Sequence, residues 1–73
     1  MTGKRRVIEE HDVVRFREAV QGWPVGTKGT VVAMHPEALM VEISDEQGAA
    51  LDFVWVPDEL LQVTWSQALQ AAV

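Results

Sequence analysis

The sequence has no cysteine and no tyrosine, and it has no lysine or arginine after Lys28. Without cysteine, disulfides, thiolate zinc sites and cysteine nucleophiles are excluded. A chain of 73 residues forms one domain at most and buries only a small core. Its stability must therefore come from apolar packing and strand pairing, or from a partner. A hydrophobic content of 48% is sufficient for such a core.

Long apolar runs are also missing. No segment approaches the roughly 20 apolar residues that a membrane-spanning helix needs. The basic start, Lys4-Arg5-Arg6, is soon followed by acidic residues rather than by an apolar stretch, so it does not resemble a signal peptide. We therefore expect a cytoplasmic protein that does not enter a membrane.

The charge is divided along the chain. The first 28 residues hold all six cations and four carboxylates, which gives +2, and the remaining residues hold seven carboxylates, which gives −7. Nucleic-acid binding needs a concentrated cationic face, so most of this chain disfavours it. A basic protein partner fits the acidic part better. The alternative is an acidic surface that only keeps the protein soluble.

Alternating apolar and polar residues predict strands over residues 11–17, 29–34, 39–44, 50–56 and 61–64. Between them the pattern indicates a long first loop over residues 18–28, with Gly26 and Gly29 bracketing a tight turn into the second strand. Further turns are expected at residues 35–38 and 45–48, and a 3₁₀ turn at residues 57–60. This order predicts an all-β fold, a five-stranded SH3-like small barrel, over residues 11–64. Residues 1–10 are expected to be a flexible arm and residues 65–73 a short C-terminal tail with helical spacing.

The strand pattern also predicts which side chains face the core. In the fourth strand, the large apolar residues are taken as inward and Asp52 and Val54 as outward. The complete inward set is Val14, Phe16, Val31, Ala33, Leu39, Val41, Ile43, Leu51, Phe53, Trp55, Leu61 and Val63.

Four segments together resemble a known family. They are Asp12–Phe16, Val25–Val32, Met40–Ile43 with the Asp45–Gly48 turn, and Leu60–Val63. The resemblance is to small bacterial domains of unknown function with an SH3-like barrel, some of which lie near toxin–antitoxin-type genes. The G-x-x-G-T-V-V element from Gly26 to Val32 also resembles the KOW motif of ribosomal and transcription-factor barrels. The resemblance implies no catalytic residue and no cofactor.

Residues able to carry chemistry are few. His11 and His35 would need two more convergent ligands to hold zinc. The adjacent carboxylates at positions 45–46 and 58–59 lie in expected turns, where acidic residues are common. No catalytic, metal-binding or cofactor-binding residue is therefore predicted, and we expect a protein that is not an enzyme.

Three tryptophans in so short a chain favour an interaction module, because tryptophan is enriched at binding hot spots. The expected partner is a protein, basic and encoded nearby, in an antitoxin-like or accessory role. The candidate partner-binding residues are Trp23, Glu42, Asp52, Trp65 and Leu69. Three alternatives stay open: tryptophans that only cap the barrel ends, a homodimer, and a KOW-like nucleic-acid binder that uses Arg15, Arg17, Lys28 and the N-terminal arm.

Overall fold

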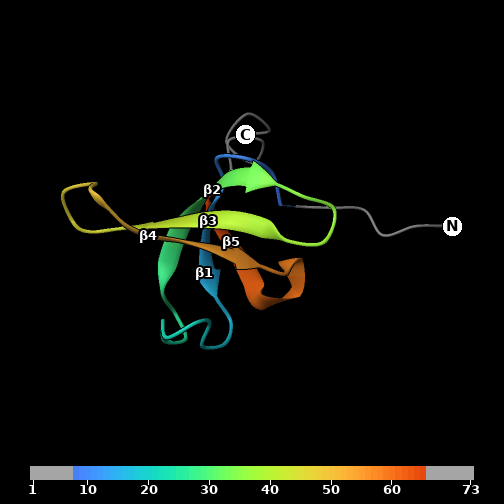
Figure 1. The fold of residues 1–73 in the computed structure, drawn as a ribbon, viewed down its shortest axis with the longest axis horizontal. Coiled ribbons are helices and arrows are strands. Elements are labelled where there is room, and N and C mark those ends of the chain that lie inside the picture. Colours follow the sequence, from blue (N-terminus) through green and yellow to red (C-terminus); the bar gives the residue numbers. More distant parts are fainter. Residues whose placement is uncertain (1–7, 66–73) are drawn as a thin grey trace, which may run out of the picture.

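The computed structural model describes residues 8–65, which form one antiparallel sheet of five strands (Figure 1). The strands are β1 (Val13–Phe16), β2 (Lys28–Met34), β3 (Leu39–Ser44), β4 (Ala50–Val56) and β5 (Leu61–Trp65). A 3₁₀ turn, η1 (Asp58–Leu60), connects β4 to β5. The all-β class, the five strands and the 3₁₀ turn are confirmed for the described part of the chain, which holds no α-helix. Of the tail expected over residues 65–73, Trp65 belongs to β5, and residues 66–73 lie outside the described residues.

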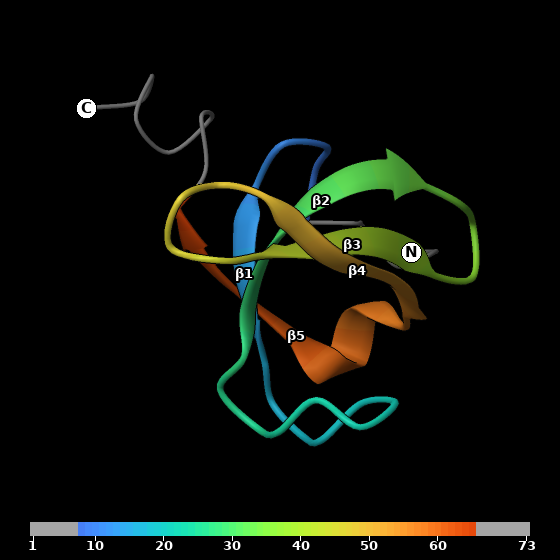
Figure 2. The ribbon, with the colours of Figure 1, turned by 60° about the vertical axis from the view of Figure 1, so that its left-hand side comes forward.

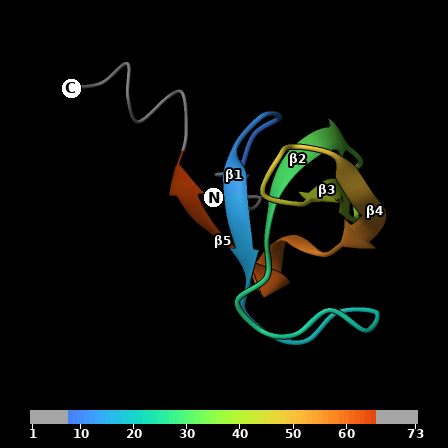
Figure 3. The ribbon, with the colours of Figure 1, turned by 90° about the vertical axis from the view of Figure 1, so that its left-hand side faces the viewer.

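The strands are ordered β4-β3-β2-β1-β5, and every neighbouring pair is antiparallel. Figure 3 shows the sheet bending round from β5 to β4, with the connection through η1 passing between them. The register shifts at Val13/Val14, Val31/Ala33 and Ile43/Ser44. Such irregularities increase the local twist and bend the strand. Strands β4 and β5 are the two edges, and no pairing between them closes the sheet.

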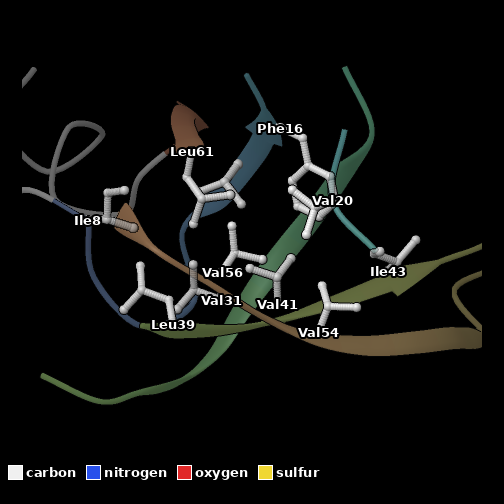
Figure 4. Close-up of a cluster of buried hydrophobic side chains, with 11 residues drawn as sticks. Ile8, Phe16, Val20, Val31, Leu39, Val41, Ile43, Val54, Val56 and Leu61 are labelled. Atoms are coloured by element: carbon white, nitrogen blue, oxygen red, sulfur yellow. The ribbon is translucent and has the colours of Figure 1, made fainter. Parts of the chain in front are cut away.

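The bend encloses one core on the concave side of the sheet, to which every strand contributes (Figure 4). The buried apolar residues are Ile8, Val14, Phe16, Val20, Val31, Leu39, Val41, Ile43, Val54, Val56 and Leu61. Within the expected inward set, burial is confirmed for Val14, Phe16, Val31, Leu39, Val41, Ile43 and Leu61. Ala33 and Val63 are only half-buried, and the expectation is wrong for the large residues of β4.

The chain enters the sheet through a turn at residues 9–12, which places Ile8 in the core. The Asp12 N–H donates to the Glu9 carbonyl (3.1 Å), and the Glu9 N–H donates to Oδ2 of Asp12 (2.9 Å). His11 takes a positive φ of 78° in this turn, and its N–H donates to the carbonyl of Val31 (2.7 Å). The buried Asp12 carboxylate thus closes the turn, and the main chain of His11 attaches the turn to β2. Residues 1–7 of the expected arm lie outside the described residues.

The long first loop folds into a small hairpin of its own, which Figure 2 shows extending beyond the ends of β1 and β2. Val20 and Trp23 exchange two main-chain hydrogen bonds, each of 2.8 Å. Gln21 and Gly22 between them have φ values of 48° and 90°, the positive pair that a type I′ turn requires. This hairpin directs Val20 into the core, so the loop is an extension of the packed structure.

The turn into β2 differs from the expected one. It spans residues 24–27, with the Thr27 N–H donating to the Pro24 carbonyl (3.2 Å) and Gly26 at a φ of 87°. Lys28 and Gly29 already belong to β2. Gly29 is needed for close packing rather than for a turn, because a Cβ there would meet the Val41 side chain.

Candidate protein-interaction surface

Strand β4 presents its largest side chains to solvent. Leu51, Phe53 and Trp55 are 56%, 52% and 45% exposed, whereas Val54 and Val56, which alternate with them, are buried. Because alternate residues of a strand face opposite sides, Phe53 and Trp55 share the convex face of this edge strand. Leu51, at the register shift between β3 and β4, extends the exposed row along the strand. We call Leu51, Phe53 and Trp55 the β4 apolar stripe.

The stripe corrects the expected orientation of β4, which is opposite to the one predicted. Both faces of this strand are apolar, so alternation alone did not fix its orientation. The prediction took the large apolar residues as inward and Asp52 as outward. In the structure Asp52 shares the side of Val54 and is half-buried. Its Oδ2 accepts a 2.8 Å hydrogen bond from the indole Nε1–H of Trp23, which compensates for the loss of water around the carboxylate.

Strand β3 supplies the neighbours of the stripe. Met40 lies opposite Trp55, and Glu42 lies opposite Phe53. Directly opposite residues of an antiparallel pair contact each other through their side chains on the same face. The half-buried Met40 therefore widens the apolar surface, and Glu42 places a carboxylate beside Phe53.

The turn between β2 and β3 adds a polar border next to Trp55. His35 and Ala38 close this turn with two main-chain hydrogen bonds of 3.0 and 3.3 Å. The His35 ring meets the Trp55 ring edge to face, with centroids 6.0 Å apart and an interplanar angle of 76°. His35, Glu37, Ala38 and Trp55 line an open hollow at this position.

The long first loop is fastened to β4 by two side chains. Besides the bond from Trp23 to Asp52, Nε2 of Gln21 donates to the Trp55 carbonyl (3.2 Å). The Phe53 N–H donates to Oδ1 of Asp52 (2.9 Å). Two main-chain groups of the edge strand are thus bonded by side chains.

The predicted partner-binding residues do not form one cluster. Trp23 and Asp52 contact each other, and Trp23 also packs against the core, so its indole N–H is already used within the fold. Glu42 lies on the convex face beside the stripe. Trp65 is 42% exposed at the end of β5, the opposite edge strand of the sheet. Leu69 lies outside the described residues.

Sequence reasoning missed the β4 apolar stripe and the hollow beside Trp55. One signal for the stripe was available in the sequence. Val54 and Val56 alternate with the bulkier residues, and two β-branched residues at this spacing fit a core as well as the bulkier residues do. The contact between His35 and Trp55 had no sequence signal, because it depends on the register of β3 and β4.

The cations of the described part lie on the other half of the sheet. Arg15 of β1 and Lys28 of β2 are exposed and directly opposite each other. Nε of Arg17 donates to the Leu61 carbonyl (3.0 Å), which ties that side chain to the start of β5. The convex face therefore has a basic part on β1 and β2 and an acidic and apolar part on β3 and β4.

Within residues 8–65, no group of three or more histidine and carboxylate side chains is placed to hold a metal ion. In the same part of the chain, no helix is long and apolar enough to cross a membrane. No protein-family model, no curated protein and no solved structure matches the chain significantly.

Proposed function

We propose that this protein is a non-enzymatic interaction module that binds a basic protein partner through the β4 apolar stripe and the carboxylates around it. The observation that carries the proposal is the exposure of Leu51, Phe53 and Trp55 in one row. Burying apolar surface at an interface contributes roughly 25 cal/mol per Å², and aromatic residues are enriched at hot spots. A row of large side chains that the fold leaves half-exposed is therefore suited to a partner.

Charge supports a basic partner rather than a second copy. Glu42 lies beside Phe53 on the convex face and Glu37 lies in the turn next to Trp55, and residues 29–65 contain no lysine or arginine. A twofold dimer through the stripe would bring the same carboxylates together from both copies, which is repulsive. A partner with cations around an apolar patch would meet complementary charge.

The fold assignment that accompanies this proposal is an SH3-like barrel. The strand order, the long loop after β1 and the 3₁₀ turn before β5 support it. With the sequence resemblance to small bacterial barrel domains, they favour an accessory or antitoxin-like role in the cytoplasm, with the partner encoded nearby.

The test is co-expression with the products of adjacent genes, followed by co-purification. The informative variant is Phe53→Thr, which removes the centre of the stripe while keeping a residue that favours strands. The matched control is Val25→Thr, because Val25 is a 63% exposed apolar residue in the first loop. We expect the complex to be lost with Phe53→Thr and retained with Val25→Thr. Retention with both variants, or the absence of any neighbour that binds, would overturn the proposal.

A further inference from the structure

The hollow beside Trp55 has a chemical character of its own. Its lining residues are two aromatic ones, Trp55 and His35, the small Ala38 and the acidic Glu37. Aromatic faces carry negative electrostatic potential, and the carboxylate adds a full negative charge. No lysine or arginine occurs between residues 29 and 65, so no cation of that stretch occupies the hollow.

The walls of the hollow are held in place before any ligand arrives. The turn at residues 35–38 is closed by two main-chain hydrogen bonds, and Pro36 fixes one of its backbone angles. Trp55 is paired with Met40 across the sheet, and its carbonyl accepts the hydrogen bond from Gln21. A preformed site loses less entropy on binding than a flexible one.

Different ligands fit this lining unequally. A carboxylate or phosphate would be repelled by Glu37. A metal ion would find only His35 and Glu37, and the described residues offer no cluster of three metal ligands. A lysine or arginine side chain fits both parts of the hollow, because its methylene stem can pack on Ala38 and Trp55 while its charged head meets Glu37.

We propose that this hollow receives a cationic side chain, lysine or arginine, of the protein partner. The inference rests on the proposed function and deepens it, because it names the group that the partner inserts next to the β4 apolar stripe. The stripe would supply the apolar contact, and the hollow would supply selectivity for a cation.

The test needs no partner and uses small probes on the full chain. N-acetyl-lysine methylamide and N-acetyl-arginine methylamide are titrated while the indole N–H signals of the tryptophans are followed by NMR. The corresponding norleucine and citrulline derivatives are the neutral controls. Trp65 is an internal reference, since it is 42% exposed, close to the 45% of Trp55. We expect saturable shifts at Trp55 and not at Trp65, with the better cation bound about fivefold more tightly than its neutral control.

Two variants test the lining separately. Trp55→Leu should lower the affinity for the cationic probes about fivefold, and Glu37→Gln should lower it about threefold, because each substitution removes one attraction for the cation. Glu46→Gln is the matched control, since Glu46 is an exposed carboxylate in the turn between β3 and β4. If Trp55→Leu does not fold, the affinity of Glu37→Gln for the cationic probes alone decides whether the hollow binds a cation.

Equal shifts at Trp55 and Trp65, equal affinity for neutral and cationic probes, or an unchanged affinity in Glu37→Gln would overturn the inference. Such a result would leave co-purification with gene neighbours as a separate test. Conversely, a partner that binds the Glu37→Gln variant as tightly as the unchanged protein would support the interaction module and overturn only the cation site.

Discussion

Gly29 lies where strands β2 and β3 approach each other closely. It is buried in β2, and a Cβ on it would lie 2.8 Å from the Glu42 carbonyl oxygen and would collide with the Val41 side chain. The nearest backbone atom belongs to a paired strand and cannot rotate away as a side chain can. Strand β3 therefore approaches β2 more closely here than any residue with a Cβ would allow.

We expect Gly29→Ala to destabilise the fold by about 1–3 kcal/mol, the usual effect of adding a methyl group to a filled core. Urea unfolding measures the change. Lys28→Ala is the control, because the neighbouring Lys28 is exposed and should change stability by less than about 0.5 kcal/mol. Equal stability of both variants would mean that β2 and β3 are not as close as the structure shows.

At the scale of the element, β4 differs from the other strands because both of its faces are apolar. Its concave face holds two valines of the core, and its convex face holds the β4 apolar stripe. The two faces therefore contribute differently to stability, because folding removes the concave side chains from water almost completely and the convex ones only in part.

We expect Val54→Ala to lower the free energy of unfolding by about 2 kcal/mol, because it leaves a cavity in the core. Phe53→Thr should change the free energy of unfolding by less than about 1 kcal/mol, because Phe53 is half-exposed and its replacement leaves no cavity in the core. Urea unfolding of both variants decides the orientation of the strand. A larger effect from Phe53→Thr would support the orientation first expected from the sequence.

The first loop is an element whose indole hydrogen bond from Trp23 is one of the contacts that hold it on the sheet. We expect Trp23→Phe to cost about 1 kcal/mol, because the ring still packs on the core but no longer donates to Asp52. Hydrogen exchange of the Val20 and Trp23 amides should accelerate as the loop loosens. Asp52→Asn keeps an acceptor oxygen and should accelerate exchange less. Unchanged exchange in Trp23→Phe would show that the indole hydrogen bond does not hold the loop in place.

How far the sequence predicts each element depends on how different its two faces are. Strand β3 alternates Leu39, Val41 and Ile43 with Met40, Glu42 and Ser44, so its inward side was predicted correctly. In β4 both alternations are apolar, and side-chain size favoured the wrong one. The partner of the Asp52 carboxylate, Trp23, is 29 residues away in sequence, and no local pattern reveals such a contact. The acidic residues of the candidate surface were therefore predicted, and its β4 apolar stripe was not.

At the scale of the whole molecule, the net charge of −5 is less informative than its distribution. The exposed pair Arg15 and Lys28 lies on β1 and β2, and the carboxylates Glu37, Glu42 and Asp52 lie toward β3 and β4. Each charged region is small. A nucleic acid would meet two adjacent cations on β1 and β2 but also the acidic half of the same sheet.

We therefore expect no measurable binding of single-stranded or duplex oligonucleotides at low salt, where phosphate contacts are strongest. A gel-shift titration against the full chain measures this. The double variant Arg15→Gln with Lys28→Gln provides the comparison. Binding that falls steeply with salt and is lost in the double variant would favour the KOW-like alternative.

The hydrogen bonds along β4 affect which main-chain groups of this edge strand can pair with another strand. The sequence from Leu51 to Val56 is rich in apolar and β-favouring residues, the composition that promotes fibre growth when a sheet edge is free to add further strands. The Phe53 N–H is bonded by Asp52 and the Trp55 carbonyl by Gln21, so these groups are not available to template a neighbouring chain. Asp52 also interrupts the apolar segment with a charge, as gatekeeper residues do. The side chains of this edge strand are thus accessible to another protein, while part of its backbone is not available for pairing with a strand of a second copy.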